Sequence, residues 1–182
     1  MIEIELKAKI ADPAAIRGKL EGFMAYQGTI EKDDEYWIVP LAVKDPSLFG
    51  GSFRVRIRRE PSQVLVTFKE KSYQEGLEVN KEVEFGVSDG DSFRQLLEKM
   101  SAKLHYRKRK TGTLWKLEGR ITAELVAVEG LGDFLEVETI CGEGEDIDLR
   151  ELKSALLEVI SRCGLSGQDL EPRPYSQLLG VL

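Results

Sequence analysis

Charged side chains recur at every second position along several short segments of this 182-residue sequence, and most segments favour one sign. Successive residues of a β-strand point to opposite faces, so each segment would form a strand with one apolar and one ionic face. The acidic faces would carry Glu3, Glu5, Glu82, Glu84, Glu136 and Glu138. The basic faces would carry Arg54, Arg56, Arg58, Lys69, Lys71, Arg107 and Arg109.

The basic faces could bind phosphoryl groups, and the acidic faces could bind a metal ion. A row of arginines and lysines can hold several phosphoryl groups, because guanidinium groups bind phosphate in a bidentate manner. Clustered carboxylates supply the hard oxygen ligands that Mg²⁺ or Mn²⁺ prefers, and such an ion can bridge phosphate oxygens. For any single strand, the alternative is a solvated face with cross-strand ion pairs. Six such strands in one chain favour instead a shared interior that is wet or holds a charged ligand and a metal, since burying unpaired charges is costly.

The periodicity of the apolar residues predicts the elements that would position these faces. Helices are expected over 13–23, 91–103 and 147–163, with a short turn over 175–179. Strands are expected over 2–10, 34–39, 53–59, 64–71, 78–87, 104–110, 114–127 and 134–140, with turns at Gly50-Gly51, Gly76, Gly112 and Gly130 to Gly132. This pattern predicts one α+β domain over residues 1–182. We expect a closed eight-stranded antiparallel β-barrel, or tunnel, with helices packed outside.

Composition restricts the class of protein. The net charge of −6 argues against a dedicated nucleic-acid binder. The sequence shows neither a signal peptide nor an apolar run of the roughly 18 residues that a membrane span needs. Cys141 and Cys163 are far apart and lack the spacing of a zinc site, so reduced thiols are expected. We therefore expect a cytoplasmic protein with no membrane or nucleic-acid partner.

Several short motifs follow one another in a fixed order along the chain. The first is the strand Glu3-Ile4-Glu5-Leu6-Lys7. The others are Asp34-Glu35-Tyr36-Trp37 with Pro40 after it, Arg54-Val55-Arg56, Thr67-Phe68-Lys69, Glu82-Val83-Glu84, Arg107-Lys108-Arg109, the stretch from Glu129 to Glu138, and Pro174-Tyr175-Ser176-Gln177-Leu178-Leu179. This set, which spans nearly the whole chain, resembles the CYTH superfamily of triphosphate tunnel metalloenzymes. That superfamily includes class IV adenylyl cyclases and thiamine triphosphatases.

The resemblance implies a triphosphate held in a tunnel through a divalent metal, Mg²⁺ or Mn²⁺. It implies that the metal ligands are Glu3, Glu5 and Glu136, with Glu138 nearby. It implies that the phosphates are held by Lys7, Arg54, Arg56, Lys69, Arg107 and Arg109, to which Arg58 and Lys71 are added from the same basic faces. In vertebrate thiamine triphosphatases a tyrosine and a lysine are proposed to activate water. The matching positions here are Tyr36 and Lys69.

One position departs from the family pattern. The family has a metal-ligating aspartate two residues before the valine of its VxGLG stretch, and that position holds Val126. We hypothesise that Glu124, two residues away on the same face, replaces this ligand through a water or a displaced metal. The alternative is that metal affinity is weakened or catalysis lost.

The basic strand around residues 106–110 can be aligned in two registers. We choose Arg107 and Arg109 for the ionic face, because Leu104 and Tyr106 would then face the helices.

The expected function is that of a metal-dependent enzyme acting on ATP, thiamine triphosphate or inorganic triphosphate. Hydrolysis of a triphosphate and cyclisation of ATP to cyclic AMP and pyrophosphate would use the same arginine, lysine and metal charges. The sequence therefore does not distinguish between these two reactions. A non-catalytic triphosphate or polyphosphate sensor is the alternative. The sequence also leaves open whether the protein is a homodimer.

Overall fold

The computed structural model describes residues 2–40, 52–74, 77–117, 120–142, 145 and 148–181, excluding the side chains of 52, 53, 69–74, 77–79 and 81. The described residues form eight strands and four helices. The strands are β1 (Ile2–Ile10), β2 (Ala25–Pro40), β3 (Ser52–Glu60), β4 (Gln63–Gln74), β5 (Leu77–Val87), β6 (Lys103–Lys116), β7 (Ile121–Val128) and β8 (Gly132–Cys141). The helices are α1 (Pro13–Leu20), α2 (Gly90–Lys99), α3 (Leu149–Arg162) and α4 (Tyr175–Leu178).

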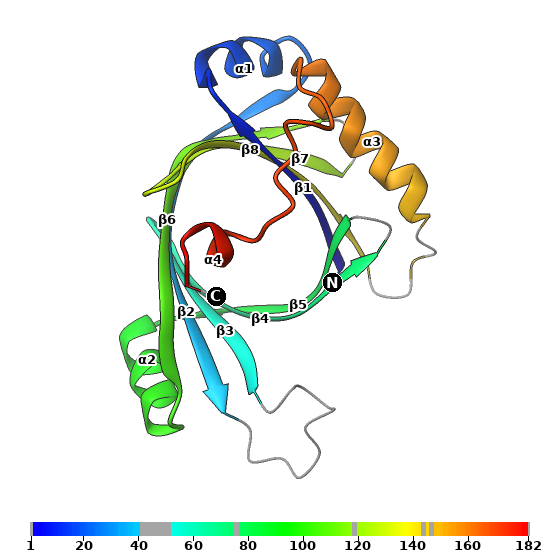
Figure 1. The fold of residues 1–182 in the computed structure, drawn as a ribbon. Helices are drawn as coiled ribbons and strands as arrows, with labels where there is room; N and C mark the ends of the chain where they lie inside the picture. Colours follow the sequence, from blue (N-terminus) through cyan, green and yellow to red (C-terminus); the bar gives the residue numbers. More distant parts are fainter. Residues whose placement is uncertain are drawn as a thin grey trace.

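The strands form one antiparallel, strongly curled sheet (Figure 1). The order of pairing is β1-β5-β4-β3-β2-β6-β7-β8, and β8 pairs in turn with β1. The seam between β1 and β5 covers only Ile2–Glu5 of β1. Beyond it, Lys9 N bonds to Asp169 O at 3.1 Å, and Glu171 N bonds to Lys7 O at 2.7 Å. The α+β class and the eight-stranded antiparallel sheet agree with the sequence prediction.

The apolar strand faces are buried on the outer, convex side of the sheet. One cluster joins β1, β7 and β8 to α1 and α3, with Trp115 among its fully buried side chains. A second cluster joins β2, β3 and β4 to α2 through Trp37 and Leu97. Both tryptophans therefore have a packing role, and helices α1, α2 and α3 lie outside the sheet as predicted (Figure 1).

Helix α4 lies on the concave side of the curled sheet, unlike the other helices (Figure 1). Tyr175 of α4 packs there with Val126, Val128 and Phe134. Its ring meets the ring of Phe134 edge-on at 5.2 Å. The expectation that all helices pack outside was therefore wrong for α4, because these three apolar residues share a concave face with ionic ones.

Several boundaries differ from the prediction. Strand β2 begins at Ala25 rather than at residue 34, and the predicted strand 114–127 is divided between β6 and β7. Gly112 is not a turn but lies inside β6, where an added Cβ would be 2.0 Å from the carbonyl oxygen of Leu125. Its lack of a side chain therefore permits close approach of β7.

The turn at Gly130 to Gly132 was predicted correctly, and both glycines have positive φ, 77° and 92°. Gly50-Gly51 and Gly76 lie outside the described residues. Among the described helices, none is long and apolar enough to cross a lipid bilayer.

Candidate functional site

The concave face of the sheet carries the ionic side chains. On β1, Ile4 is fully buried in the outer core, so Glu3 and Glu5 on either side of it point to the concave side. The same alternation places on the concave face Lys7 of β1, Arg54, Arg56 and Arg58 of β3, Glu124 of β7, and Glu136 and Glu138 of β8. The side chains of Lys69 and Lys71 lie outside the described residues. Strand alternation thus brings most of the predicted site residues to one surface.

At one end of this surface, carboxyl groups lie close to one another. Glu138 accepts a hydrogen bond from Thr122 at 3.0 Å. Burial raises the pKa of Glu138 well above its ordinary value, and the negative charges of Glu3 and Glu124 raise it further. Glu5 lies opposite Glu138 in the register of β1 and β8. Among the described side chains, carboxyl groups therefore gather at this end.

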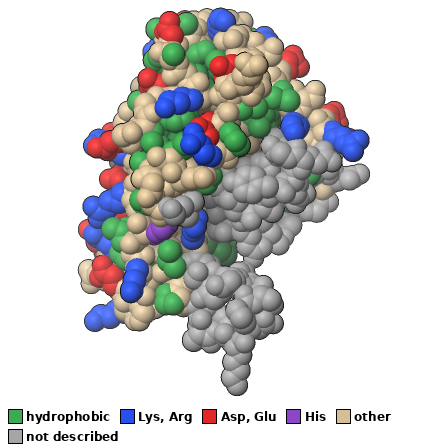
Figure 2. Space-filling model, in the orientation of Figure 1, with side chains coloured by type: hydrophobic (Ala, Val, Ile, Leu, Met, Phe, Trp, Pro, Cys, Tyr) green, Lys and Arg blue, Asp and Glu red, His purple; other side chains and the backbone are tan. Residues whose placement is uncertain are grey.

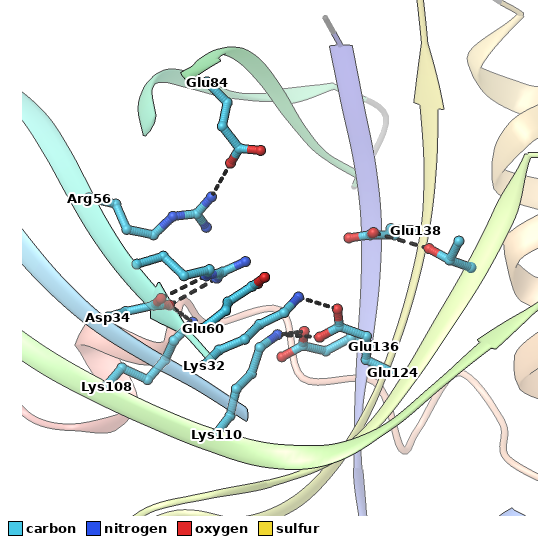
Figure 3. Close-up of polar contacts among 12 residues, drawn as sticks. Lys32, Asp34, Arg56, Glu60, Glu84, Lys108, Lys110, Glu124, Glu136 and Glu138 are labelled. Atoms are coloured by element: carbon cyan, nitrogen blue, oxygen red, sulfur yellow. Dashed lines mark hydrogen bonds and ion pairs between the residues drawn. The ribbon is translucent and has the colours of Figure 1, made fainter. Parts of the chain in front are cut away.

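In the middle of the surface, two carboxylates meet two lysines (Figure 3). Lys110 Nζ lies 2.6 Å from Glu124 Oε2 and 2.5 Å from Glu136 Oε2. Lys32 forms a further ion pair with Glu124 Oε1. Burial would lower the pKa of Lys110, but Glu124 and Glu136 raise it above its ordinary value. Burial likewise would raise the pKa of Glu124, but Lys110 and Lys32 lower it. Burial and the charge of Glu124 would raise the pKa of Glu136, but Lys110 and Lys108 lower it below its ordinary value. All three buried groups therefore remain ionised.

A third group of charges surrounds Asp34, which is fully buried. Arg58 donates two hydrogen bonds to its carboxylate, at 2.7 and 2.9 Å, and Lys108 Nζ lies 3.4 Å away. The Tyr36 hydroxyl donates to Asp34 at 3.3 Å. Burial would raise the pKa of Tyr36, but the positive charge of Lys108 and the nearby arginines lower it below its ordinary value. The Tyr36 hydroxyl therefore loses its proton more readily than an ordinary tyrosine.

Arg56 projects between the Asp34 group and the acidic side of β5 (Figure 3). It donates hydrogen bonds to Thr67 at 2.9 Å and Glu84 at 3.3 Å, and lies 3.9 Å from Glu82. Its buried Nε atom has no hydrogen-bond partner among the described residues. A buried guanidinium N–H without an acceptor is costly, so this atom is suited to an incoming anionic oxygen.

The choice of Arg107 and Arg109 for the concave face was wrong. Their side chains are 60% and 54% exposed and pair on the outer surface with Glu35 and Glu31, at 3.0 and 2.5 Å. Acidic and basic side chains are mixed along that edge of the molecule (Figure 2).

A register shift in β6 explains the error. Tyr36 pairs with Tyr106, but the next residue, Trp37, pairs with Leu104, so His105 is an extra residue. Such a β-bulge reverses which residues point inward. Leu104 and Tyr106 therefore lie on opposite faces, and Lys108 and Lys110 occupy the concave positions instead.

Comparison with known proteins shows the family of this chain. Residues 1–175 match the CYTH domain. The chain belongs to the CYTH domain family. It is 26% identical, over the full length of both chains, to a Methanocaldococcus jannaschii protein named "Putative adenylate cyclase MJ0240".

Solved structures of other proteins share the fold of this chain. The PH1012 protein of Pyrococcus horikoshii is 28% identical, with 97% of this chain and 98% of that chain covered and a TM-score of 0.80. The Hippeastrum protein HpAC1 shares the fold, with 15% identity, coverage of 98% and 94%, and a TM-score of 0.59. HpAC1 is named "Putative adenylyl cyclase" and is described as revealing a dominant triphosphatase activity.

Besides the contacts of Lys108 and Lys110, three further concave-side contacts of this CYTH domain were not predicted. Lys32 was missed because the polar first half of β2 shows little alternation, although Lys32 is two residues before Asp34 and so shares its face. Tyr106 stacks on Tyr36, with ring centroids 4.3 Å apart. Tyr175 donates a hydrogen bond to Glu136 at 2.5 Å. The stacking of Tyr106 could not be foreseen without the bulge.

CYTH proteins use a divalent metal ion, and the carboxyl groups at the acidic end can be compared with the ligands that such an ion needs. Among the described residues, no three His, Cys, Asp or Glu side chains enclose a metal position as they stand. Glu3, Glu5 and Glu138 project from the concave faces of the paired strands β1 and β8. Carboxylate oxygens are the ligands that a hard divalent cation prefers. The chemistry of this donor set therefore fits a divalent ion.

Proposed function

We propose that this protein is a divalent-metal-dependent enzyme that binds a triphosphate inside a closed tunnel formed by the curled sheet. One observation carries the proposal: the concave face separates arginines of β3 from carboxylates of β1 and β8. Arg54 and Arg56 would hold phosphoryl oxygens, assisted by Lys7, Lys108 and, by analogy with the family, Lys69 and Lys71. Mg²⁺ or Mn²⁺ would bind the carboxylates and neutralise the phosphates.

Hydrolysis is the reaction that we favour. The Tyr36 hydroxyl donates to Asp34, and the positive charge of Lys108 lowers its pKa; once it has lost its proton, the Tyr36 oxygen would be suited to accept a proton from an attacking water. Cyclisation of ATP is the second candidate, supported by the name of the Methanocaldococcus relative. It would require an adenine pocket, for which the sequence offers no motif. The candidate substrates for hydrolysis are ATP, thiamine triphosphate and inorganic triphosphate.

Incubation of the purified protein with each of these three compounds, with Mg²⁺ or Mn²⁺ and with EDTA, tests the proposal. Phosphate release indicates a triphosphatase, cyclic AMP with pyrophosphate indicates a cyclase, and binding without turnover indicates the sensor. The matched variants are Glu5→Gln, which should abolish turnover, and Glu31→Gln on the outer surface, which should retain it. Equal activity of both variants would show that the metal assignment is wrong or that a contaminant is responsible.

A further inference from the structure

The second half of strand β5 forms an open edge of the sheet. Strand β1 pairs with residues 78–81 of β5, and residues 83–87 pair with β4 on their other side. On the side of β1, no strand or loop in the described part of the chain pairs with residues 83–87. Residues 83–86 are all exposed. The backbone N–H and C=O groups along this edge can therefore pair with another strand.

Exposed apolar side chains adjoin this edge on the outer face of the sheet. Val83 and Phe85 share that face with Val87, which packs in the core beneath α2. Val83 and Phe85 are nevertheless 48% and 43% exposed, and Phe68, opposite Val83 on β4, is 40% exposed. Helix α2 borders this surface, where Phe93 meets Phe85 edge-on at 6.2 Å. An open strand edge beside exposed apolar surface is typical of a protein–protein contact.

The inward side chain of Glu84 restricts which strand can pair here. Glu84 accepts a hydrogen bond from Arg56 at 3.3 Å on the concave side (Figure 3). An acidic residue directly opposite Glu84 would be repelled, because like charges opposite one another destabilise a sheet. Two copies of β5 can pair antiparallel about a two-fold axis, so that one residue lies opposite itself. If that residue is Phe85, then Gly86 of the second copy lies opposite Glu84, and the repulsion is avoided.

Other registers of this two-fold pairing are less favourable. Centring on Glu84 places two glutamates opposite each other, and centring on Val83 places Glu82 opposite Glu84. Centring on Gly86 would pair only residues 85–87, because β5 ends at Val87. Centring on Phe85 pairs residues 83–87. On the outer face it brings the two Phe85 rings together and places Val83 against Val87, and such aromatic and apolar cross-strand pairs stabilise a sheet.

We propose that two copies of this chain associate through residues 83–87 of β5, in an antiparallel pair centred on Phe85. The curled sheets of the two copies would then be continuous across the two-fold axis. The pairing would also hold the part of β5 that presents Glu84 to Arg56. Because the contact is short, association should depend on protein concentration. The proposal does not depend on the reaction that the protein catalyses.

Disulfide trapping tests the register. Directly opposite residues of an antiparallel pair have Cα atoms about 4.5–5.5 Å apart, within the range that a disulfide spans. Phe85→Cys should therefore form a covalent dimer under mild oxidation, measured by gel electrophoresis without reductant. Val83→Cys is the matched control, because Val83 is similarly exposed but the two Val83 Cα atoms would be about 14 Å apart along the strands. Wild type should form no covalent dimer, because Cys141 and Cys163 are buried.

The two cysteine variants decide between the possible arrangements. A covalent dimer of Phe85→Cys alone supports the proposal. Equal cross-linking of Phe85→Cys and Val83→Cys would show that the register is wrong. If Phe85→Cys gives no covalent dimer, the two β5 edges do not meet at this residue and the proposal fails.

Sedimentation equilibrium over a range of protein concentrations tests the contact without a new cysteine. We expect wild type to be a reversible dimer. Phe85→Lys places two ammonium groups opposite each other at the axis and should raise the dimer dissociation constant about tenfold or more. Leu96→Lys is the control, because Leu96 is 53% exposed on α2, away from the β5 edge, and it should stay within about twofold of wild type.

Two results of this measurement would overturn the proposal. One is a wild-type protein that is monomeric at every concentration. The other is a dimer that Leu96→Lys dissociates and Phe85→Lys does not, because the contact would then lie on α2. Circular dichroism shows whether each variant is folded, and if Phe85→Lys is not, the milder Phe85→Cys still tests the pairing. Neither measurement uses enzyme activity, so a failure of the proposed function is distinguishable from a failure of the dimer.

Discussion

The phenol oxygen of Tyr175 lies 2.5 Å from Oε1 of Glu136, so a residue of the C-terminal helix directly contacts the ionic centre of the concave face. The Tyr175 ring also lies 4.5 Å from the Lys7 ammonium and 4.8 Å from that of Lys108. Helix α4 is only four residues long and could not fold alone. Its position is therefore held by these contacts and by the apolar group beneath it.

Replacement of Tyr175 by phenylalanine should destabilise the protein. The ring and its contacts with the lysines remain, but Glu136 loses a buried donor. Hydrogen bonds to charged groups contribute about 1.5–3 kcal/mol, and we expect a loss of unfolding free energy of that size in urea titrations. Tyr26→Phe is the control, because Tyr26 is 48% exposed, and it should change stability by less than about 0.5 kcal/mol. Equal effects of the two substitutions would contradict this account.

The arginines of β3 should differ from those of β6 in their effect on substrate binding. The buried Nε of Arg56 has no hydrogen-bond partner in the part of the chain that the structure describes, whereas Arg109 is exposed and pairs with Glu31. Loss of a charge-assisted contact of about 1.5–3 kcal/mol lowers kcat/KM by about 10- to 100-fold, and we expect this for Arg56→Met. Arg109→Met should stay within about twofold of wild type. A large loss in Arg109→Met would mean that the inward register of β6 is misassigned.

Strand alternation was enough to predict much of this surface. The inward faces of β1, β3 and β8 follow from period two alone, because the opposite face of each strand is mainly apolar. The prediction failed in β6, where the extra residue His105 reverses the alternation, and a bulge leaves little mark on a sequence.

The first half of β2 was missed for a different reason. It is mostly polar and contains Gly28, a residue type common in turns, although in the structure Gly28 lies inside β2 with a φ of 125°. The pairing of Lys110 with Glu124 could not be foreseen, because a register across two strands must be known first. A single sequence does not provide it.

The buried pair of Asp34 and Arg58 should make stability depend on pH in the acid range. Burial would raise the pKa of Asp34, but Arg58 and Lys108 lower it, and Arg56 and Tyr36 also face the carboxylate. A carboxyl with a lowered pKa contributes stability above its unfolded value of about 3.9 and loses it as the pH falls toward the folded value.

Asp34→Asn isolates this contribution. Breaking one partner of a buried ion pair costs about 3–5 kcal/mol, so the variant should be less stable than wild type by that amount near pH 7. The difference between the two proteins should shrink below about pH 4, where wild-type Asp34 begins to lose its advantage. Urea unfolding at a series of pH values measures this. A difference that stayed constant down to about pH 2 would show that protonation of Asp34 is not linked to unfolding.

Alanine substitutions at two glycines should have opposite effects on the stability of the protein. A Cβ at Gly112 would lie 2.0 Å from Leu125 O and 2.8 Å from the Cα of Val126, both backbone atoms that cannot rotate away. Gly112→Ala must therefore separate β6 from β7, at a cost of about 1–3 kcal/mol or more for overpacking. Because Lys110 and Glu124 lie on these same strands, the separation should also disturb their ion pair.

Gly18→Ala is the matched substitution. Gly18 lies within α1, and an added Cβ would have no heavy atom within 4 Å. Alanine lowers the entropy of the unfolded chain and favours the helix, so this variant should gain about 0.4–1 kcal/mol. Thermal and urea unfolding of both variants measure the two effects. If Gly112→Ala were as stable as wild type, β6 and β7 could not approach as closely as the structure shows, and the contact between Lys110 and Glu124 would lose its geometric basis.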